Sequence, residues 1–283
     1  MTIARYEVFQ KVVELGNFTR AAEQLNMTQS AVSHAISSLE KEFGYPLLHR
    51  NKQAKIQKTA FADRVLPHIR QILNSEAIIK QEISLQNNQL AGTLKIGAFT
   101  SAAAQILPKM LSQFKENYSE IKVILFEGTY KEIVEWIHNG TVDVGFIIEE
   151  NTKKQFQSIP VTKDEIVLGL SKNHPLVNEK TVDIKTIANM DFIMPKGPYQ
   201  SLVLENLSAH EVCPNIILEV LSCETIVNMV SQNIGISMGP ELFFKSHRNI
   251  EIKKLKQKKY RQINLAYKER TPIINAFLVC NQL

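Results

Sequence analysis

The chain has 283 residues, of which 44% are hydrophobic, so it can bury a large core and is long enough for more than one domain. Its formal charge of +5, from 33 basic and 28 acidic residues, permits nucleic-acid binding without indicating it. The three cysteines, Cys213, Cys223 and Cys280, contain no Cys-x-x-Cys pair, which argues against a zinc site or a disulfide framework. No stretch looks like a signal peptide or a membrane span, so we expect a cytoplasmic protein with no metal or cofactor.

Residues 18–44 predict two helices joined by a tight turn, with Thr19 and Thr28 as N-caps. The apolar arc of the second helix consists of Ala31, Val32, Ala35, Ile36, Leu39 and Phe43. Its opposite arc is polar and consists of Gln29, Ser30, Ser33, His34, Ser37 and Lys41. The apolar arc can pack on the first helix, which leaves short polar side chains free to contact base edges in a DNA groove. By periodicity alone, the same pair could equally be an ordinary packing unit.

A basic segment follows from Tyr45 to Thr59 and favours the DNA-binding interpretation. It contains no acid, and its basic residues are His49, Arg50, Lys52, Lys55 and Lys58. We expect a basic hairpin, or wing, beside the helix pair. Such a wing would supply the phosphate contacts that a nearly neutral recognition helix lacks.

A family resemblance rests on Phe18-Thr19-Arg20-Ala21-Ala22-Glu23, Leu25, Gln29-Ser30-Ala31-Val32-Ser33, Ile36, Leu39-Glu40, Gly44, Leu47 and Arg50. With these residues the N-terminal segment resembles the LysR-type transcriptional regulators. The resemblance implies a winged helix-turn-helix domain, placed at residues 1–58, that binds double-stranded operator DNA. The predicted DNA contacts are Thr28, Gln29, Ser30, Ser33, His34, Ser37, Arg50, Lys52 and Lys55. His34 departs from the family, which commonly has Arg at this position.

Residues 59–90 predict a long linker helix with an apolar seam. One heptad position is occupied by Ala62, Ile69, Glu76, Ile83 and Leu90, and the other by Val65, Ile72, Ile79 and Gln86. Pro67 should bend this helix near its start. A seam of this kind needs a partner helix, so we expect a dimer through residues 59–90. The resemblance implies the same pairing, and the family commonly forms tetramers.

Strand-like and helix-like segments alternate after Gly92, which predicts an α/β fold with parallel strands. The expected strands are 93–98, 122–126, 142–148, 166–171, 192–194, 216–220 and 234–238, and the expected helices are 102–117, 131–139, 201–210 and 224–232. The resemblance implies that residues 91–283 form a two-lobed effector domain like a type 2 periplasmic binding protein. Its first lobe would contain residues 91–161 and 266–283, and its second lobe residues 162–265.

Ligands of open α/β sheets bind beyond the carboxyl ends of strands, where helices begin. The residues that meet this condition are Thr100, Ser101, Thr129, Lys196, Tyr199 and Gln200. Together they favour a small anionic effector, and the resemblance places them in the cleft between the lobes. Each Thr or Ser, taken singly, fits a helix cap equally well.

Two alternatives concern the class of protein. Gly235-Ile-Ser237-Met-Gly239 matches the Gly-x-Ser-x-Gly motif of hydrolases. After Ser237, however, the one histidine is His247 and the one acid between them is Glu241, too close for a triad, so we expect no enzyme. A transport-type binding protein would need export and would leave residues 1–90 without a purpose.

Two further segments have less specific patterns. The basic run from Lys253 to Arg261 could be a second nucleic-acid patch, but it fits a solvated strand edge better, where Lys discourages sheet-to-sheet pairing. Some members of the resembled family sense oxidants with two cysteines in the C-terminal half. No Lys, Arg or His is adjacent in sequence to Cys213 or Cys223, which favours two unreactive thiols.

Overall fold

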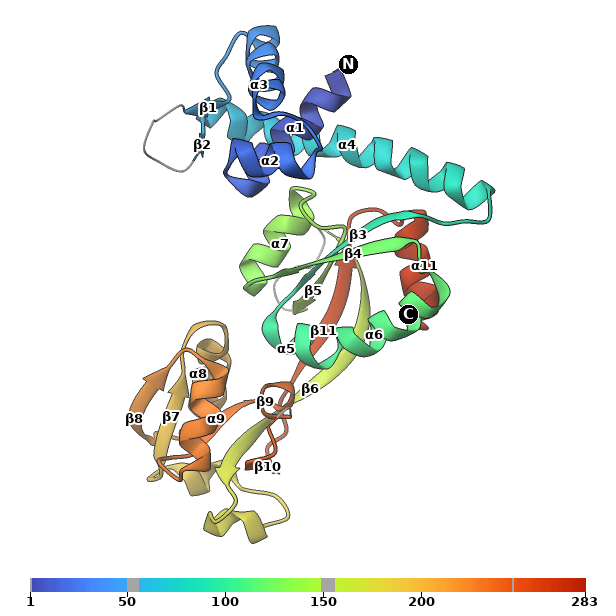
Figure 1. The fold of residues 1–283 in the computed structure, drawn as a ribbon. Helices are drawn as coiled ribbons and strands as arrows, with labels where there is room; N and C mark the ends of the chain where they lie inside the picture. The colour runs from blue at the N-terminus through green and yellow to red at the C-terminus, as the bar shows by residue number, and fades with distance from the viewer. Residues whose placement is uncertain (1, 50–55, 149–155, 246) are drawn as a thin grey trace.

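The computed structural model describes residues 2–49, 56–148, 156–245 and 247–283. A helical N-terminal domain lies at one end, a long helix runs from it, and two α/β lobes follow one below the other (Figure 1). The mixed α/β architecture with two lobes agrees with the predicted fold class. No helix of the described ranges is long and apolar enough to cross a membrane.

In its described residues, 2–49 and 56–58, the N-terminal domain contains three helices and the two short paired strands of a hairpin. The helices are α1 (Thr2–Leu15), α2 (Phe18–Gln24) and α3 (Gln29–Phe43), and the hairpin strands are β1 (Leu48–His49) and β2 (Gln57–Lys58). The prediction that Thr19 caps α2 is wrong, because Asn17 Oδ1 accepts the hydrogen bond from the Arg20 backbone N–H at 3.0 Å. Helix α2 therefore begins earlier than expected, and Thr19 lies within its first turn.

The linker helix is α4 (Ala60–Gln86), which Thr59 caps by accepting from the Ala62 N–H at 3.1 Å. Its N-terminal third, with Ala62, Leu66 and Ile69, is buried against the N-terminal domain. Its C-terminal half instead exposes Ile79 and Ile83, each with 59% of its surface accessible. Part of the apolar seam predicted for this helix is thus buried within the chain, and the rest is exposed to solvent.

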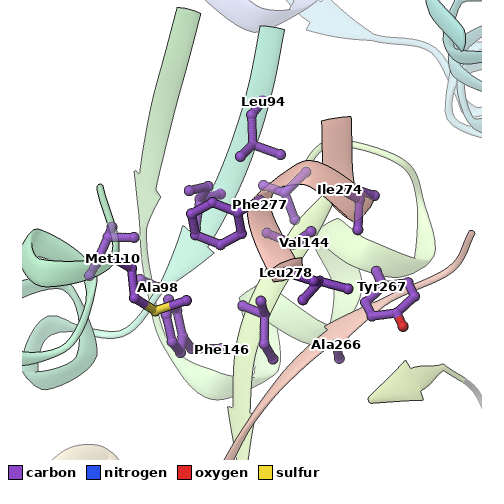
Figure 2. Packing of buried hydrophobic residues seen from close by; sticks show 14 of the residues in the cluster. Leu94, Ala98, Met110, Val144, Phe146, Ala266, Tyr267, Ile274, Phe277 and Leu278 are labelled. Carbon is purple, nitrogen blue, oxygen red and sulfur yellow. The ribbon is translucent and has the colours of Figure 1, made fainter. Parts of the chain in front are cut away.

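The first lobe is built on the parallel strands β3 (Gly92–Ala98), β4 (Ile121–Glu127) and β5 (Val144–Ile148). Its helices are α5 (Thr100–Gln105), α6 (Leu107–Asn117), α7 (Tyr130–His138) and α11 (Pro272–Cys280). Figure 2 shows Phe146 of β5 and Phe277 of α11 among the buried side chains that fill the space beside the sheet. The single helix expected at 102–117 is two helices, because Pro108 lies in the first turn of α6 and cannot donate to a continuous helix.

The two lobes share the long strands β6 (Gln157–Ser171) and β11 (Tyr260–Tyr267), which pair antiparallel and run from one lobe into the other (Figure 1). Together with β3 to β5 and β10 they form one sheet in the order β10-β6-β11-β5-β3-β4. The prediction of parallel strands therefore holds only in part. The strand expected at 166–171 is only the second half of β6. Its first half, Gln157 to Glu165, was not predicted because it lacks a continuous apolar run.

The second lobe contains the strands β7 (Asp191–Pro195), β8 (Asn215–Val220), β9 (Ser237–Pro240) and β10 (Ile250–Lys254), and the helices α8 (Gln200–Ala209), α9 (Cys223–Ser231) and α10 (Glu241–Phe244). It also has three short 3-10 helices, at Pro175–Asn178, Ile184–Ile187 and Gly197–Tyr199. Strand β7 pairs parallel with β8, while β9 and β10 each pair antiparallel with β6. Lys253 and Lys254 lie on β10 at the edge of the large sheet, as expected for a lysine-rich strand edge.

Candidate functional site

Helix α3 has one buried face and one accessible face. Val32, Ile36 and Leu39 are fully buried against α1, α2 and α4. The predicted DNA-contacting residues lie on the other side: Thr28, Gln29, Ser30 and His34 are exposed, and Ser33 and Ser37 are half-buried. The hydroxyl of Thr28 is the N-cap of α3, accepting from the Ala31 N–H at 3.2 Å, so this residue has a structural role whether or not it contacts DNA.

The hairpin that follows α3 is attached to it by a carboxylate. Oε1 of Glu40 accepts hydrogen bonds from the backbone N–H groups of Leu47 at 2.8 Å and Leu48 at 3.2 Å. Leu48 then pairs with Lys58 across the two strands. The predicted phosphate contacts at Arg50, Lys52 and Lys55 lie outside the described residues. The described strands of the hairpin, β1 and β2, lie in the same N-terminal domain as α3 (Figure 1).

A buried arginine joins the two lobes where β6 and β11 pass between them. The guanidinium of Arg261, on β11, donates from Nε at 2.9 Å and from Nη2 at 2.6 Å to Oδ2 of Asp164, on β6. The side chains of Arg261 and Asp164 are 2% and 1% exposed, so this ion pair is almost wholly desolvated. A buried charge must be paired and hydrogen-bonded to be tolerated, and this pair meets that condition.

The same guanidinium contacts residues of the first lobe. Its Nη2 donates to Oγ of Ser101 at 3.1 Å, and its Nη1 donates to the phenol oxygen of Tyr130. Tyr199 of the second lobe donates to the same Ser101 hydroxyl at 3.4 Å. Burial raises the pKa of Tyr130 more than the nearby Arg261 lowers it, so the phenol remains neutral. We call Arg261, Asp164, Ser101, Tyr130 and Tyr199 the inter-lobe cluster.

Two cavities lie beside this cluster, and between them they contain three of the six predicted effector residues. The first cavity, about 640 Å³, is lined by Thr129, Tyr130, Lys131, Val134, Ile148, Gly197 and Ser201. The second, about 410 Å³, is lined by Thr100, Ser101, Ala104, Leu221, Ser222, Cys223, Glu224, Leu242, Phe243 and His247. The sequence had grouped Thr129 with Thr100 and Ser101, but in the structure they line different cavities.

The remaining predicted effector residues have other surroundings. Tyr199 is buried in the inter-lobe cluster, with its ring 5.4 Å from that of Phe243. Lys196 forms an ion pair of 2.8 Å with Glu219 at the surface of the second lobe and lines neither cavity. Gln200 is half-buried at the start of α8, and it also lines neither cavity. Thr129 forms a full capping box with Glu132, so the cap expected as an alternative does exist there.

Arg261 was not among the site residues predicted from the sequence. The prediction that it belongs to a solvated basic run is wrong, because Arg261 lies in the interior between the lobes. A signal was present: on a strand, Arg261 shares a face with Ile263 and Leu265, which are both fully buried. Arginine at a position where the strand pattern requires an apolar residue indicates a buried, paired charge.

The hydrolase-like motif has no exposed nucleophile. Ser237 is fully buried on β9, and its hydroxyl donates at 2.8 Å to the carbonyl oxygen of Ile193. The turn that would lift a nucleophilic serine above the sheet is therefore not formed around this residue. No group of three or more potential metal ligands occurs among the described residues.

The two cysteines of the second lobe differ in environment. Cys213 is exposed, and Cys223 is half-buried at the start of α9, where burial raises its thiol pKa to about 11. Thiol reactivity depends on the thiolate, which such a pKa suppresses at neutral pH. This environment agrees with the expectation that Cys223 is unreactive.

The chain is similar to known proteins along most of its length. The model of the LysR substrate binding domain matches residues 87–280, and that of the bacterial regulatory helix-turn-helix protein, lysR family, matches residues 3–63. The HTH-type transcriptional regulator YvbU of Bacillus subtilis is 30% identical over 269 residues, covering 94% of this chain and 91% of YvbU. A full-length variant of OxyR from Pseudomonas aeruginosa matches with a TM-score of 0.80 at 22% identity, covering 100% of this chain and 94% of that one. Full-length CbnR complexed with its target DNA matches with a TM-score of 0.69 at 20% identity, covering 100% and 99%.

A helix-turn-helix domain joined by a long helix to a two-lobed α/β domain defines a regulator that binds DNA at one end and a ligand at the other. The family models and YvbU identify which regulators these are: the chain belongs to the LysR family. It is a DNA-binding transcriptional regulator with an effector-binding domain. This confirms the family that the N-terminal sequence resembled.

We predict that Asp164→Asn destabilises the protein strongly, because it leaves the guanidinium of Arg261 buried without a counterion. Breaking one side of a buried ion pair typically costs about 3–5 kcal/mol. The measurement is urea unfolding followed by circular dichroism. The matched control is the double variant Asp164→Asn, Arg261→Met, which removes both charges and should recover a large part of the loss. A single variant as stable as the wild type would contradict the proposed importance of the pair.

We predict that Cys223 reacts with iodoacetamide far more slowly than Cys213 at pH 7.5. With a pKa of about 11, only about one Cys223 thiol in a thousand or fewer is ionised at this pH. Peptide mass spectrometry after a timed reaction measures both sites in one sample. Raising the pH to 9 should speed the labelling of Cys223 more than tenfold. Equal rates at the two cysteines at pH 7.5 would contradict the prediction.

Proposed function

We propose that this regulator reads its operator with the polar face of α3 and responds to a small anionic metabolite bound between the lobes. The observation that carries the effector half of the proposal is the cavity of about 640 Å³ beside the inter-lobe cluster, which combines a cation with hydroxyl and apolar side chains. The DNA half rests on the exposed short polar side chains of α3, opposite its buried face.

Gln29 and Ser33 are the residues proposed to read base edges. A glutamine can bond adenine bidentately in the major groove, and a serine can donate or accept there. Because no cation lies at either position, this face contributes specificity rather than general affinity for DNA. Arg50, Lys52 and Lys55, which follow β1 in sequence, are proposed to supply the phosphate contacts that orient the helix.

The functional unit is proposed to be a dimer formed through α4. Ile72, Ile79 and Ile83 are each at least 44% exposed on this helix, and their spacing places them along one side. Large aliphatic side chains in such a row favour burial against a second helix. A dimer would present two copies of α3 to two half-sites, and further pairing of dimers would give the tetramer expected from the family.

The effector is proposed to be an organic anion in the cavity lined by Lys131. Its anionic group would lie beside the ammonium of Lys131 and the first turn of α7, where the helix dipole favours negative charge. Its apolar part would contact Val134 and Ile148. Arg261 is not the proposed anchor, because the carboxylate of Asp164 already neutralises it.

Control of DNA binding would follow from a change in how the lobes contact each other. The cavity is lined by residues of both lobes, with Lys131 in the first and Ser201 in the second. A ligand that bridges them would favour one arrangement of the lobes over another. The coupling to DNA is then the difference in ligand affinity between those arrangements.

We predict that Gln29→Ala weakens binding to operator DNA while leaving binding to random-sequence DNA nearly unchanged. The loss of one bidentate base contact should reduce discrimination by about 1–3 kcal/mol. Gel-shift titration with the DNA upstream of the gene and with a shuffled duplex measures both affinities. Gln113→Ala, an exposed position on α6, is the control and should behave as wild type. Equal loss on both DNAs would contradict direct readout by Gln29.

We predict that Lys131→Gln reduces the small anion retained by the purified protein. Native mass spectrometry of wild type and variant, followed by denaturing release, compares the occupancy of the metabolite. Lys109→Gln removes an exposed charge elsewhere on the first lobe and serves as the control. If the wild type carries an anion whose occupancy is the same in Lys131→Gln, the effector lies elsewhere and this part of the proposal is wrong.

A further inference from the structure

A separate cavity of about 440 Å³ lies where α1, α4 and the first lobe meet, and it shares no lining residue with the inter-lobe cluster. It is lined by Gln10 and Lys11 at the end of α1, by residues 70–81 of α4, and by the exposed ends of β3 and β4 with the loop before β5. In Figure 1 this is the region where α4 passes across the first lobe. The cavity thus touches the DNA-binding domain, the linker helix and the effector domain at once.

The lining of this cavity is strongly cationic. Its basic residues are Lys11, Arg70, Lys80, Lys95 and Lys122, and Asp143 is its one acidic residue among the described part of the chain. We call these five residues the junction cations. Basic side chains gathered from three segments repel one another, so their convergence on one cavity needs a compensating negative charge.

The neighbouring carboxylates compensate for only part of this charge. Glu14 pairs with Lys11 at 3.0 Å, and Glu76 pairs with Lys80 at 2.9 Å. Oδ2 of Asp143 accepts from the backbone N–H of Lys95 at 2.7 Å, and burial raises the pKa of this carboxyl despite that bond. In the described ranges, Arg70, Lys95 and Lys122 have no carboxylate within 4 Å of their charged nitrogens.

The fold brings these three cations to one cavity. Strands β3 and β4 are parallel, with Thr93 paired to Lys122 and Lys95 paired to Ile124, so the side chains of Lys95 and Lys122 leave the same face of the sheet. Arg70 lines the cavity from α4, and its Nε is buried without an acceptor among the described residues. A buried N–H of this kind is costly unless an acceptor satisfies it.

We propose that this cavity binds a small polyanion, such as a phosphorylated metabolite, between the DNA-binding domain and the first lobe. Phosphate oxygens would accept hydrogen bonds from Arg70, Lys95 and Lys122, as phosphate groups do from arginine and lysine in general. Leu73, Ala77 and Ile124 provide an apolar wall for the rest of the molecule. The site is distinct from the inter-lobe cavity and does not depend on the effector proposed there.

A ligand in this site would restrain the parts of the chain that it joins. Its anionic groups would contact cations of α4 and of the strands β3 and β4, and Lys11 of α1 lies at the edge of the same cavity. Binding would therefore stabilise the arrangement in which the DNA-binding domain and linker helix pack on the first lobe. A second signal could in this way change how the DNA-binding domains are held, independently of the inter-lobe effector.

Isothermal titration of pyrophosphate into the full-length protein tests the proposal, at constant ionic strength and without DNA. We expect saturable binding, tighter than that of acetate. Lys95→Gln, Lys122→Gln as a double variant should weaken it by roughly tenfold or more, because two charged hydrogen-bond donors are lost. The charge-matched control is Lys109→Gln, Lys172→Gln, which removes two exposed lysines that do not line this cavity. It should bind as the wild type does.

A variant that removes a negative charge near the cavity should have the opposite effect on pyrophosphate binding. The pKa of the Glu14 carboxyl is lowered: burial raises it, but hydrogen bonds and the charges of Lys11 and Lys95 outweigh burial. The negative charge of Glu14 in turn stabilises the charged form of Arg70. Glu14→Gln removes a competing negative charge and should tighten pyrophosphate binding severalfold. Absence of saturable binding, or equal weakening in the two double variants, would overturn the proposal. Binding that is unchanged in Lys95→Gln, Lys122→Gln would place the anion on the DNA-binding surface instead and would also overturn it.

Discussion

The buried ion pair between Arg261 and Asp164 is the interaction on which the two-lobed domain depends. Two charges in a desolvated interior must stay together, because separating them would leave each without compensation. This requirement holds β6 and β11 side by side where they pass between the lobes, and it brings Ser101 and Tyr130 of the first lobe onto the same guanidinium. Each of these two residues also lines one of the two cavities, Tyr130 the first and Ser101 the second.

At the other end of the molecule, specificity and affinity for DNA are assigned to different elements. The accessible face of α3 is polar and nearly uncharged, while basic residues are concentrated in the sequence segment from Tyr45 to Thr59 that follows it. Glu40 couples the two elements through hydrogen bonds to the backbone of Leu47 and Leu48. These bonds fix the start of β1 relative to α3, so phosphate contacts made by the following segment would help to orient the helix.

The linker helix connects these two ends physically as well as in sequence. Oε1 of the buried Gln81 in α4 accepts from the backbone N–H of Ile273 at the start of α11, at 3.3 Å. Gly92 lies against the same two residues, at a φ of +145° that L side chains rarely adopt. Through this contact the linker helix packs on the effector domain close to the junction cations.

Local patterns in the sequence determined the elements and the polar face of α3. The two-sided helix from Gln29 to Phe43 could be predicted because a helical face depends only on residues within a few turns. The motifs of the N-terminal segment also determined the family. Some local details still differed: Asn17 rather than Thr19 caps α2, and Pro108 divides the helix expected at 102–117, because caps and breaks depend on single residues.

Tertiary structure alone decided the composition of the sites. Ser101, Asp164 and Arg261 are brought together by strand pairing across the domain, and no spacing in the chain records that contact. The same holds for Arg70 and Lys95, which line one cavity only because α4 packs on the first lobe. The sequence determined which side chains could carry charge or read DNA. The fold decided which of them are neutralised and which remain available to a ligand, because burial and pairing are long-range properties.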